Sequence, residues 1–372
     1  ETSSNGRKVA GKRRASKTKI EVPEETSPAP EPPAQPIPPS RGVLLYSLLA
    51  TISMYVHERA GTQLNSLTRS PMFVSAFKRV FDSADILGPT IVTPALAIVA
   101  EVINNEPSVL SFFLSVGLVA SALQAVDRPR EHAEWLQTFP ALLQAVSLTI
   151  DGTAEVQKHN VFPRFFTIFH DDAYVSPASR VLMGEAAPML GGAFEELLRN
   201  SPGLKTQCVA AVATALRTLV AKGKACASDA CDEKFRAVLH HATNFATFFD
   251  QLAGRGGVVQ EFVEQGGLRE FMELVRVVVK PARYILSTLA AVTDDTQPMV
   301  GHSPALMYVF RCLMHAGREQ FQMTFEFLLH ELEQELATLP HTLSALDAFQ
   351  SASASGSNMG AGLYAGLLHR VP

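Results

Sequence analysis

Three residues that suit the end of a helix recur at a spacing of 43 positions: Gly117, Asn160 and Gly203. Each lies between apolar stretches, and both residue types adopt the left-handed conformation at low cost, so each can end a helix and reverse the chain. Armadillo and HEAT arrays have this repeat length, and their helices bury their apolar faces by stacking on neighbouring repeats. The spacing favours an all-α, armadillo/HEAT-like helical solenoid. An irregular bundle of helices of the same lengths is the alternative.

A fourth turn of this kind is predicted at Gly266-Gly267, between the apolar stretch Phe262–Gln265 and Leu268. We predict that Gly117 and Gly267 adopt positive φ just after a helix. The leucine that follows each glycine is then expected to begin the next buried helix.

The body of the chain, from Arg41 to about Phe349, reads as helical throughout. It has no sustained alternation of apolar and polar residues and no Asn-Gly or Asp-Gly hairpin between apolar runs. Thr206–Val220 is predicted as a buried helix. One later helix is predicted to gather six apolar residues on one face: Phe321, Phe325, Leu328, Leu332, Leu336 and Leu339. Five prolines are expected near helix starts: Pro140, Pro177, Pro188, Pro202 and Pro304.

The two ends of the chain differ from this body. Residues 1–40 hold a basic cluster at positions 7–19 and then eight prolines between Pro23 and Pro39, so we predict a disordered arm. The basic cluster suits either a nuclear-import signal or contact with an anion, or it is a solvated tail. Residues 350–372 are predicted to form a flexible Ser/Ala/Gly-rich tail, which leaves residues 41–349 for the solenoid.

Composition excludes several classes of protein. With 47% hydrophobic and 18% charged residues, the chain is not wholly disordered. Residues 41–372 hold 25 Lys/Arg against 31 Asp/Glu, so nucleic acid is expected to bind, if at all, only through residues 7–19. Four cysteines are too few for a disulfide framework, which favours the reducing cytoplasm or nucleus. Because the chain begins at Glu1 rather than Met, we expect a fragment or a processed product.

One uncharged run is long enough to cross a membrane. Pro107–Val126 reaches 20 residues, but it contains four serines, a glycine and a glutamine that a lipid-facing helix disfavours. We expect two short buried helices with a turn at Gly117, and no membrane span.

Motifs that carry catalytic chemistry are missing from the sequence. It has no Gly-x4-Gly-Lys-Ser/Thr, no His-Glu-x-x-His and no Gly-x-Ser-x-Gly. His170-Asp171-Asp172 contains groups suited to acid/base work, but a polar turn after a helix explains it better. Gly360, Gly362 and Gly366 only superficially match a dinucleotide loop, since no strand precedes them.

Zinc is the one metal that the cysteines and histidines suggest. Cys226 and Cys231, followed by His240 and His241, are candidate ligands. Adjacent histidines cannot both point the same way on a helix, so a loop with two free thiols is the expectation. Cys208 and Cys312 are predicted core residues. We therefore predict no catalytic, cofactor-binding or metal site.

Four phrases, taken in order, match a known family. They are Glu106–Leu110 running to Leu118, Phe139–Gly152, Phe194–Leu204 and Glu261–Leu268. Together they resemble the N-terminal armadillo-like region of the giant HECT-type ubiquitin ligases, the Mule and plant UPL class, over roughly Ile98 to Leu313. The family usually has Asn in place of Thr149 or Asp151 and His near Asn200, and the basic, Pro-rich start is not a feature expected of it.

The resemblance implies a part of a ligase without its catalytic centre. In that family a C-terminal HECT domain supplies the cysteine that carries ubiquitin as a thioester, and none of the four cysteines here lies in a HECT-like context. The expected function is a non-catalytic scaffold that holds protein substrates for ubiquitination, with no small-molecule substrate. A free-standing adaptor or assembly scaffold with no ubiquitin role is the alternative, and an enzyme with an unrecognised site is the third hypothesis.

Overall fold

The computed structural model describes residues 38–58, 62–125, 133–228, 232–254 and 257–278, followed by short stretches between 311 and 337. All of them belong to the second of two compact units, Pro36–Pro372. The described residues form helices and no strand, which confirms the predicted all-α class. Both predicted terminal segments, except for the last residues of the arm, lie outside the described residues. So does Pro304.

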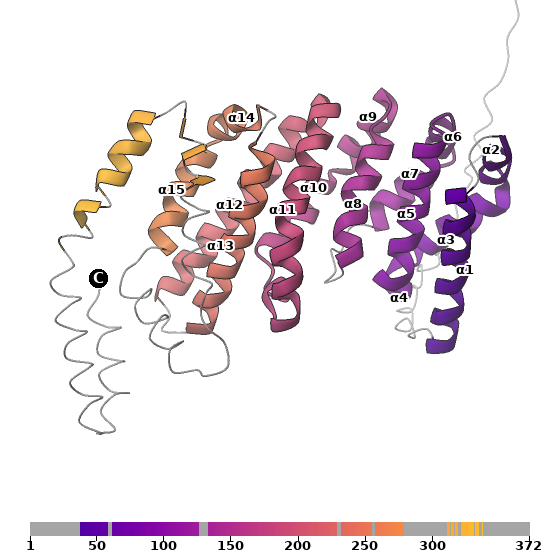
Figure 1. The fold of residues 1–372 in the computed structure, drawn as a ribbon, viewed down its shortest axis with the longest axis horizontal. Helices are drawn as coiled ribbons and strands as arrows, with labels where there is room; N and C mark the ends of the chain where they lie inside the picture. The colour runs from indigo at the N-terminus through magenta and orange to yellow at the C-terminus, as the bar shows by residue number, and fades with distance from the viewer. Residues whose placement is uncertain are drawn as a thin grey trace, which may run out of the picture. The chain divides into compact units, whose positions relative to one another are not determined.

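The middle of the described region, from α6 to α13, consists of three consecutive repeats of helices (Figure 1). The first repeat is α6 (Val109–Ser115), α7 (Leu118–Ala125) and α8 (Ala133–Val146). The second is α9 (Ile150–His159), α10 (Val161–Phe165) with the 3-10 turns η1 (Phe166–Phe169) and η2 (Asp172–Val175), and α11 (Pro177–Asn200). The third is η3 (Pro202–Leu204), α12 (Lys205–Ser228) and α13 (Asp232–Leu252), and α14 (Val258–Glu264) and α15 (Gly267–Val278) follow. Before them come α1 (Pro39–Glu58), α2 (Thr62–Thr68), α3 (Pro71–Asp82), α4 (Ala84–Leu87) and α5 (Pro89–Asn105).

The helices form two layers. In the first layer α1, α5, α8, α11 and α13 each pack against the next, and Figure 1 shows them side by side in chain order. In the second layer α3 packs on α7, α7 on α9, α10 on α12, and α12 on α15. The first-layer helices α5 and α11 begin at Pro89 and Pro177, 88 residues apart with α8 between them, which is 44 residues per repeat. The structure therefore contains the predicted solenoid repeat at nearly the predicted length.

The turns between the short helices confirm part of the prediction. Gly117 has φ +73° and Asn160 has φ +47°, both left-handed. Gly203 does not take this conformation, because Pro202 begins a 3-10 turn that leads directly into α12. The residues that follow the four turns are fully or almost fully buried: Leu118, Val161, Leu204 and Leu268.

The prediction for Gly267 is wrong. The left-handed residue is Gly266, with φ +81°, whose N–H donates to the Val263 carbonyl at 2.9 Å. Gly267 is already the first residue of α15, and a side chain there would collide with the ring of Phe262. Both glycines are therefore required, but for different physical reasons.

Two prolines expected near helix starts lie inside helices instead. Pro140 is within α8 and Pro188 within α11, and Pro94 similarly interrupts α5, whereas Pro177 and Pro202 do begin their elements. A proline removes one backbone donor and tends to kink the helix. Three neighbouring first-layer helices thus share an interior proline.

Aromatic rings connect the repeats through the core. Contacts with ring centroids between 4.4 and 6.0 Å apart join α8, α10, α11, α13, α14 and α15, through Trp135–Phe165, Phe165–Phe194, Phe194–Phe248, Phe249–Phe262 and Phe249–Phe271. These side chains are almost fully buried. Burial of such large apolar surfaces is the main force that holds one repeat on the next.

The helical stretch at residues 321–330 packs differently from the prediction. Phe321 and Phe325 stack on each other at 5.7 Å but are 61% and 49% exposed, and Leu332 is also exposed. The buried residues in this stretch are Thr324 and Phe327. Leu336 and Leu339 lie outside the described residues.

The uncharged run Pro107–Val126 divides into α6 and α7 with the predicted turn at Gly117. Throughout the described part of the chain, no helix has both the length and the apolar character that crossing a membrane requires.

Candidate protein-interaction surface

The outward sides of α5, α8 and α11 form a surface that we call the ladder face. It consists of the exposed or half-buried residues Thr90, Pro94, Ala97 and Glu101 of α5, Glu134, Gln137, Ala141 and Gln144 of α8, and Val181, Glu185, Met189, Gly192 and Glu196 of α11. Gln144 joins two of the helices, since its Nε2 donates to the Ala193 carbonyl at 3.2 Å.

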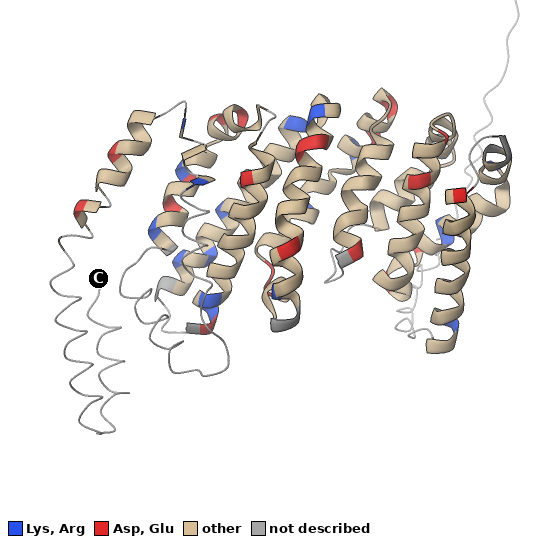
Figure 2. Cartoon of the chain, in the orientation of Figure 1, with Lys and Arg blue, Asp and Glu red and all other residues tan. Residues whose placement is uncertain are grey.

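On α5 and α8, two of the three helices of the ladder face, the charged residues are all acidic. Neither α5 nor α8 contains a Lys or Arg, and Figure 2 shows acidic residues on the ribbons of α5, α8 and α11. Arg180 and Arg199 lie near the two ends of α11, and Arg180 Nε donates to the Val175 carbonyl at 2.8 Å. In the second layer, α12 alone carries four cationic residues, Lys205, Arg217, Lys222 and Lys224.

Large apolar side chains are exposed on and beside the ladder face. Val181 is 70% and Met189 56% exposed, both on α11. At the turn that leads from α8 to α9, Leu148 and Ile150 are 55% and 88% exposed. Contiguous apolar patches with a polar rim mark protein-binding surfaces, whereas single exposed apolar residues are common on any soluble protein.

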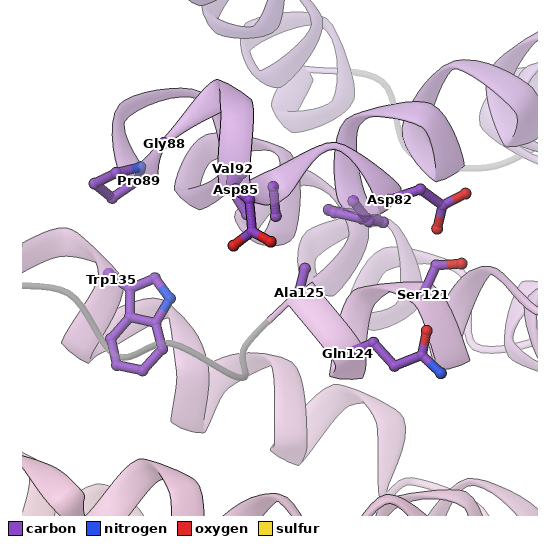
Figure 3. Close-up of a pocket in the computed structure, with 11 residues that line it drawn as sticks. Asp82, Asp85, Gly88, Pro89, Val92, Ser121, Gln124, Ala125 and Trp135 are labelled. Atoms are coloured by element: carbon purple, nitrogen blue, oxygen red, sulfur yellow. The ribbon is translucent and has the colours of Figure 1, made fainter. Parts of the chain in front are cut away.

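A pocket of about 220 Å³ opens where α3, α4, α5, α7 and α8 meet (Figure 3). Asp82 and Asp85 supply carboxylates, Ser121 and Gln124 supply neutral polar groups, and the indole of Trp135 lies opposite Asp85. Among the residues that the structure describes, the lining contains no Lys, Arg or His.

A second polar site lies where η2 meets α12 and α13. Lys222 Nζ bonds to Asp172 Oδ1 and donates to the His170 carbonyl at 2.9 Å, and His241 Nε2 lies 3.6 Å from the same Asp172 oxygen. Burial, together with the Lys222 charge, lowers the pKa of His241 to about 4. Burial would raise the pKa of Asp172, but the hydrogen bond and charge of Lys222 lower it.

This cluster includes residues that were singled out in the sequence. The sequence suggests acid/base work for His170 and Asp172 and zinc binding for His241, and the structure brings these residues together with Lys222, which no sequence motif marks. The Asp172 side chain is 65% exposed and is neutralised by Lys222. Its geometry is that of a structural ion pair that joins α12 and α13 to η2.

The cysteines that the structure describes are core residues. Cys208 and Cys312 are fully buried and Cys226 nearly so. Burial raises the pKa of the Cys208 and Cys312 thiols above the ordinary range. Cys312 Sγ donates to the Ala246 carbonyl at 2.9 Å, beside an ion pair between Arg311 and Asp250. Cys231, one of the four candidate zinc ligands, lies outside the described residues, and within the described ranges no group of three or more His, Cys, Asp or Glu could hold a metal ion.

The structure explains why the second of the four phrases has a glycine at position 152. Gly152 lies in the first turn of α9, where a side chain would collide with the Val146 carbonyl, and its N–H donates to Thr149 Oγ1 at 3.1 Å. Thr149 is therefore the N-cap of α9. The phrase encodes a tight connection from α8 to α9.

Comparisons with known proteins agree with these phrases. E3 ubiquitin-protein ligase TOM1 of Saccharomyces cerevisiae is 26% identical over 175 residues, which is 46% of this chain and 5% of TOM1. E3 ubiquitin-protein ligase HUWE1 of Mus musculus is 27% identical over 194 residues, or 50% of this chain and 4% of HUWE1. E3 ubiquitin-protein ligase UPL1 of Arabidopsis thaliana is 27% identical over 167 residues, or 45% of this chain and 4% of UPL1.

These matches cover N-terminal, non-catalytic regions of HECT-type ligases and about half of this chain, which confirms the resemblance. The chain itself spans only about one twentieth of each relative's length. The family model for the Domain of Unknown Function DUF913 matches residues 8–236. That range includes the basic, Pro-rich start, which was not expected of the family, and ends before the fourth phrase. The chain belongs to the DUF913 family.

Proposed function

We propose that this chain is a non-catalytic scaffold that holds protein substrates for ubiquitination by a HECT-type ligase. The observation that supports the proposal best is the ladder face, an open helical surface with exposed apolar side chains on a rigid two-layer frame. Repeat arrays offer long surfaces on which binding energy is spread over many side chains. That the relatives are E3 ubiquitin-protein ligases connects this holding role to ubiquitin.

A test of the proposal starts from Met189, because it projects from the centre of the ladder face. A photoreactive amino acid at this position should cross-link partner proteins when the full chain is irradiated in an extract of its own cells. The matched control places the same amino acid at Thr214, which is exposed on α12 in the other layer. The proposal predicts adducts from position 189 that position 214 does not give.

The second half of the test asks whether the captured proteins are substrates. Met189→Asp in the chromosomal gene should lower the ubiquitination of those proteins, while Thr214→Asp should leave it unchanged. If position 189 captures partners whose ubiquitination does not respond to Met189→Asp, the chain is a free-standing adaptor. If neither position captures a partner, the ladder face is not the binding surface.

A further inference from the structure

We propose that the helices of the ladder face carry no lysine because a lysine there would accept ubiquitin in place of the bound protein. The inference rests on the proposed function, since only a surface that holds substrates lies where ubiquitin is transferred to them. It adds which amino groups of this chain are kept out of that transfer, which the relatives' names do not state.

Lysines are unevenly distributed between the two layers. Residues 79–204, which include α5, α8, α11 and the connections between them, contain a single lysine, Lys158 on the second-layer helix α9. Lysine is among the commonest residues of soluble domains, so a stretch of this length with one lysine is unusual. The first-layer helix α1 has none, and α13 has Lys234 near its start. The second layer has Lys78 on α3 and three lysines on α12.

Positive charge is not what the first layer excludes. Arg41 lies on α1, and Arg180 and Arg199 lie on α11. Arginine and lysine have nearly equal helix propensities, so helix formation does not distinguish them. Their chemistry does, because a lysine amine can lose its proton and act as a nucleophile, whereas the guanidinium of arginine stays protonated.

The second layer has a lysine at a position where the ladder face has other residues. On α9, Lys158 Nζ bonds to Glu155 Oε1, three residues earlier, at 3.0 Å. Such pairs stabilise helices. At the same spacing on the ladder face, Glu134 is followed by Gln137 and Glu196 by Arg199. The carboxylates that could pair with a lysine are therefore present, and the amine is not.

The transfer reaction explains why an amine on this surface would interfere. A HECT-type ligase carries ubiquitin as a thioester, and the nitrogen of an unprotonated lysine attacks the thioester carbonyl carbon. A C–N bond forms, the C–S bond breaks, and the cysteine leaves as a thiolate, which the proton lost by the nitrogen neutralises. A lysine fixed beside the bound substrate has a high effective concentration, because it needs no binding step. It would compete with the substrate for ubiquitin.

Gln137→Lys tests this inference, because Gln137 is exposed on α8 within the ladder face. The variant is introduced into the chromosomal gene, and mass spectrometry measures the Gly-Gly remnant that trypsin leaves on a ubiquitinated lysine. We expect this remnant at position 137, together with a loss of ubiquitination of the proteins captured from position 189. Gln137→Arg adds the same charge without the amine and should leave their ubiquitination at the parent's level.

Thr214→Lys is the control for location, because Thr214 is exposed on α12 in the second layer. Its remnant should stay well below that at position 137, and thermal melts should show that all three variants fold. An absent remnant at position 137, or equal remnants at positions 137 and 214, would overturn the inference. So would equal losses of substrate ubiquitination in Gln137→Arg and Gln137→Lys, because the charge would then be responsible.

The two proposals can fail separately. If Met189→Asp lowers the ubiquitination of the captured proteins but Gln137→Lys is not modified, the scaffold role stands and the exclusion of lysine has another cause. If position 189 captures no partner, the scaffold role fails whatever is found at position 137.

Discussion

Gln157 and Gly203, 46 residues apart in the sequence, are joined by a hydrogen bond of 2.7 Å from Gln157 Nε2 to the Gly203 carbonyl oxygen. Gln207 makes the reverse connection, because its Nε2 donates to the Gln157 carbonyl at 3.0 Å and to Asn160 Oδ1 at 2.7 Å. Two glutamines thus satisfy the polar groups of two consecutive turns. Each turn is stabilised by its neighbour as well as by its own glycine or asparagine.

Gln157→Ala is therefore expected to destabilise the fold although the side-chain contact is at the surface. The loss should be about 0.5–1.5 kcal/mol in the free energy of unfolding, since one hydrogen bond is removed and its acceptor can turn to water. Urea denaturation of Gln157→Ala, Gln207→Ala and the double variant measures it. Strict additivity of the two single effects would show that the turns are not coupled.

The Gly266-Gly267 pair separates two kinds of glycine requirement. Gly266→Ala forces a side chain into the left-handed region, where a residue with a Cβ is strained by about 1–2 kcal/mol, although no atom lies within 4 Å of the added carbon. Gly267→Val drives a branched side chain into the Phe262 ring and should lose about 1–3 kcal/mol or more.

Gly42→Ala in α1 is the control for both variants, because it meets no neighbouring atom and removes a flexible residue from a helix. Its melting temperature should equal or exceed that of the parent. A Gly267→Val protein that melts like the parent would contradict the close approach of Phe262 to α15.

Acid should weaken the fold through His241. Its pKa is about 4 in the folded protein against 6.5 for an ordinary histidine, so the unfolded chain binds more protons between these values. The free energy of unfolding should therefore fall as the pH drops from about 6.5 to 4, by at most about 3 kcal/mol from this group. The lowered pKa of His170 acts in the same direction.

His241→Phe tests this dependence, because it keeps a ring and removes the titrating group. Denaturation curves at several pH values should show a shallower loss of stability for His241→Phe than for the parent. Thr243→Ala, on the same helix, has no titrating group and should keep the parent's slope. An unchanged slope in His241→Phe would assign the acid sensitivity to other groups.

No ubiquitin thioester is expected on this chain. The Cys208 and Cys312 thiols are fully buried with raised pKa values, so they supply neither access nor a thiolate at neutral pH. Incubation with an activating enzyme, a conjugating enzyme and ubiquitin, followed by a non-reducing gel, measures the adduct. A band that disappears with reductant and with Cys208→Ala or Cys312→Ala would contradict the scaffold role.

The repeat could be predicted from the sequence because its signals are local. Gly117 and Asn160 both have left-handed backbone, and their spacing of 43 residues predicts the repeat length from the sequence. The sequence does not show which of Gly266 and Gly267 is left-handed, since either glycine permits the turn. The packing of the Phe262 ring against Gly267 distinguishes them. Pro188 is predicted near a helix start, because local propensity favours proline there. It lies inside α11 instead, since tertiary packing holds this helix together across the proline.

The polar cluster and the pocket could not be predicted without the fold. Asp172 and His241 are 69 residues apart, and neither local sequence indicates the other or Lys222. The pocket takes its lining from four separate elements before α8 as well as from α8 itself, so no single motif marks it. One local signal of the ladder face is present in the sequence, since α5 and α8 contain no Lys or Arg although both have exposed sides.

The stacking of each repeat on its neighbours has a mechanical consequence. A force applied along the array reaches the middle repeats only through the terminal ones, so helices should detach in order from an end rather than all at once. Each detached repeat releases 44 residues of slack, which is about 150 Å of extended chain. An array of this kind lengthens in steps under tension and recoils as the repeats dock again, so it can hold a load over a range of lengths without losing its whole fold.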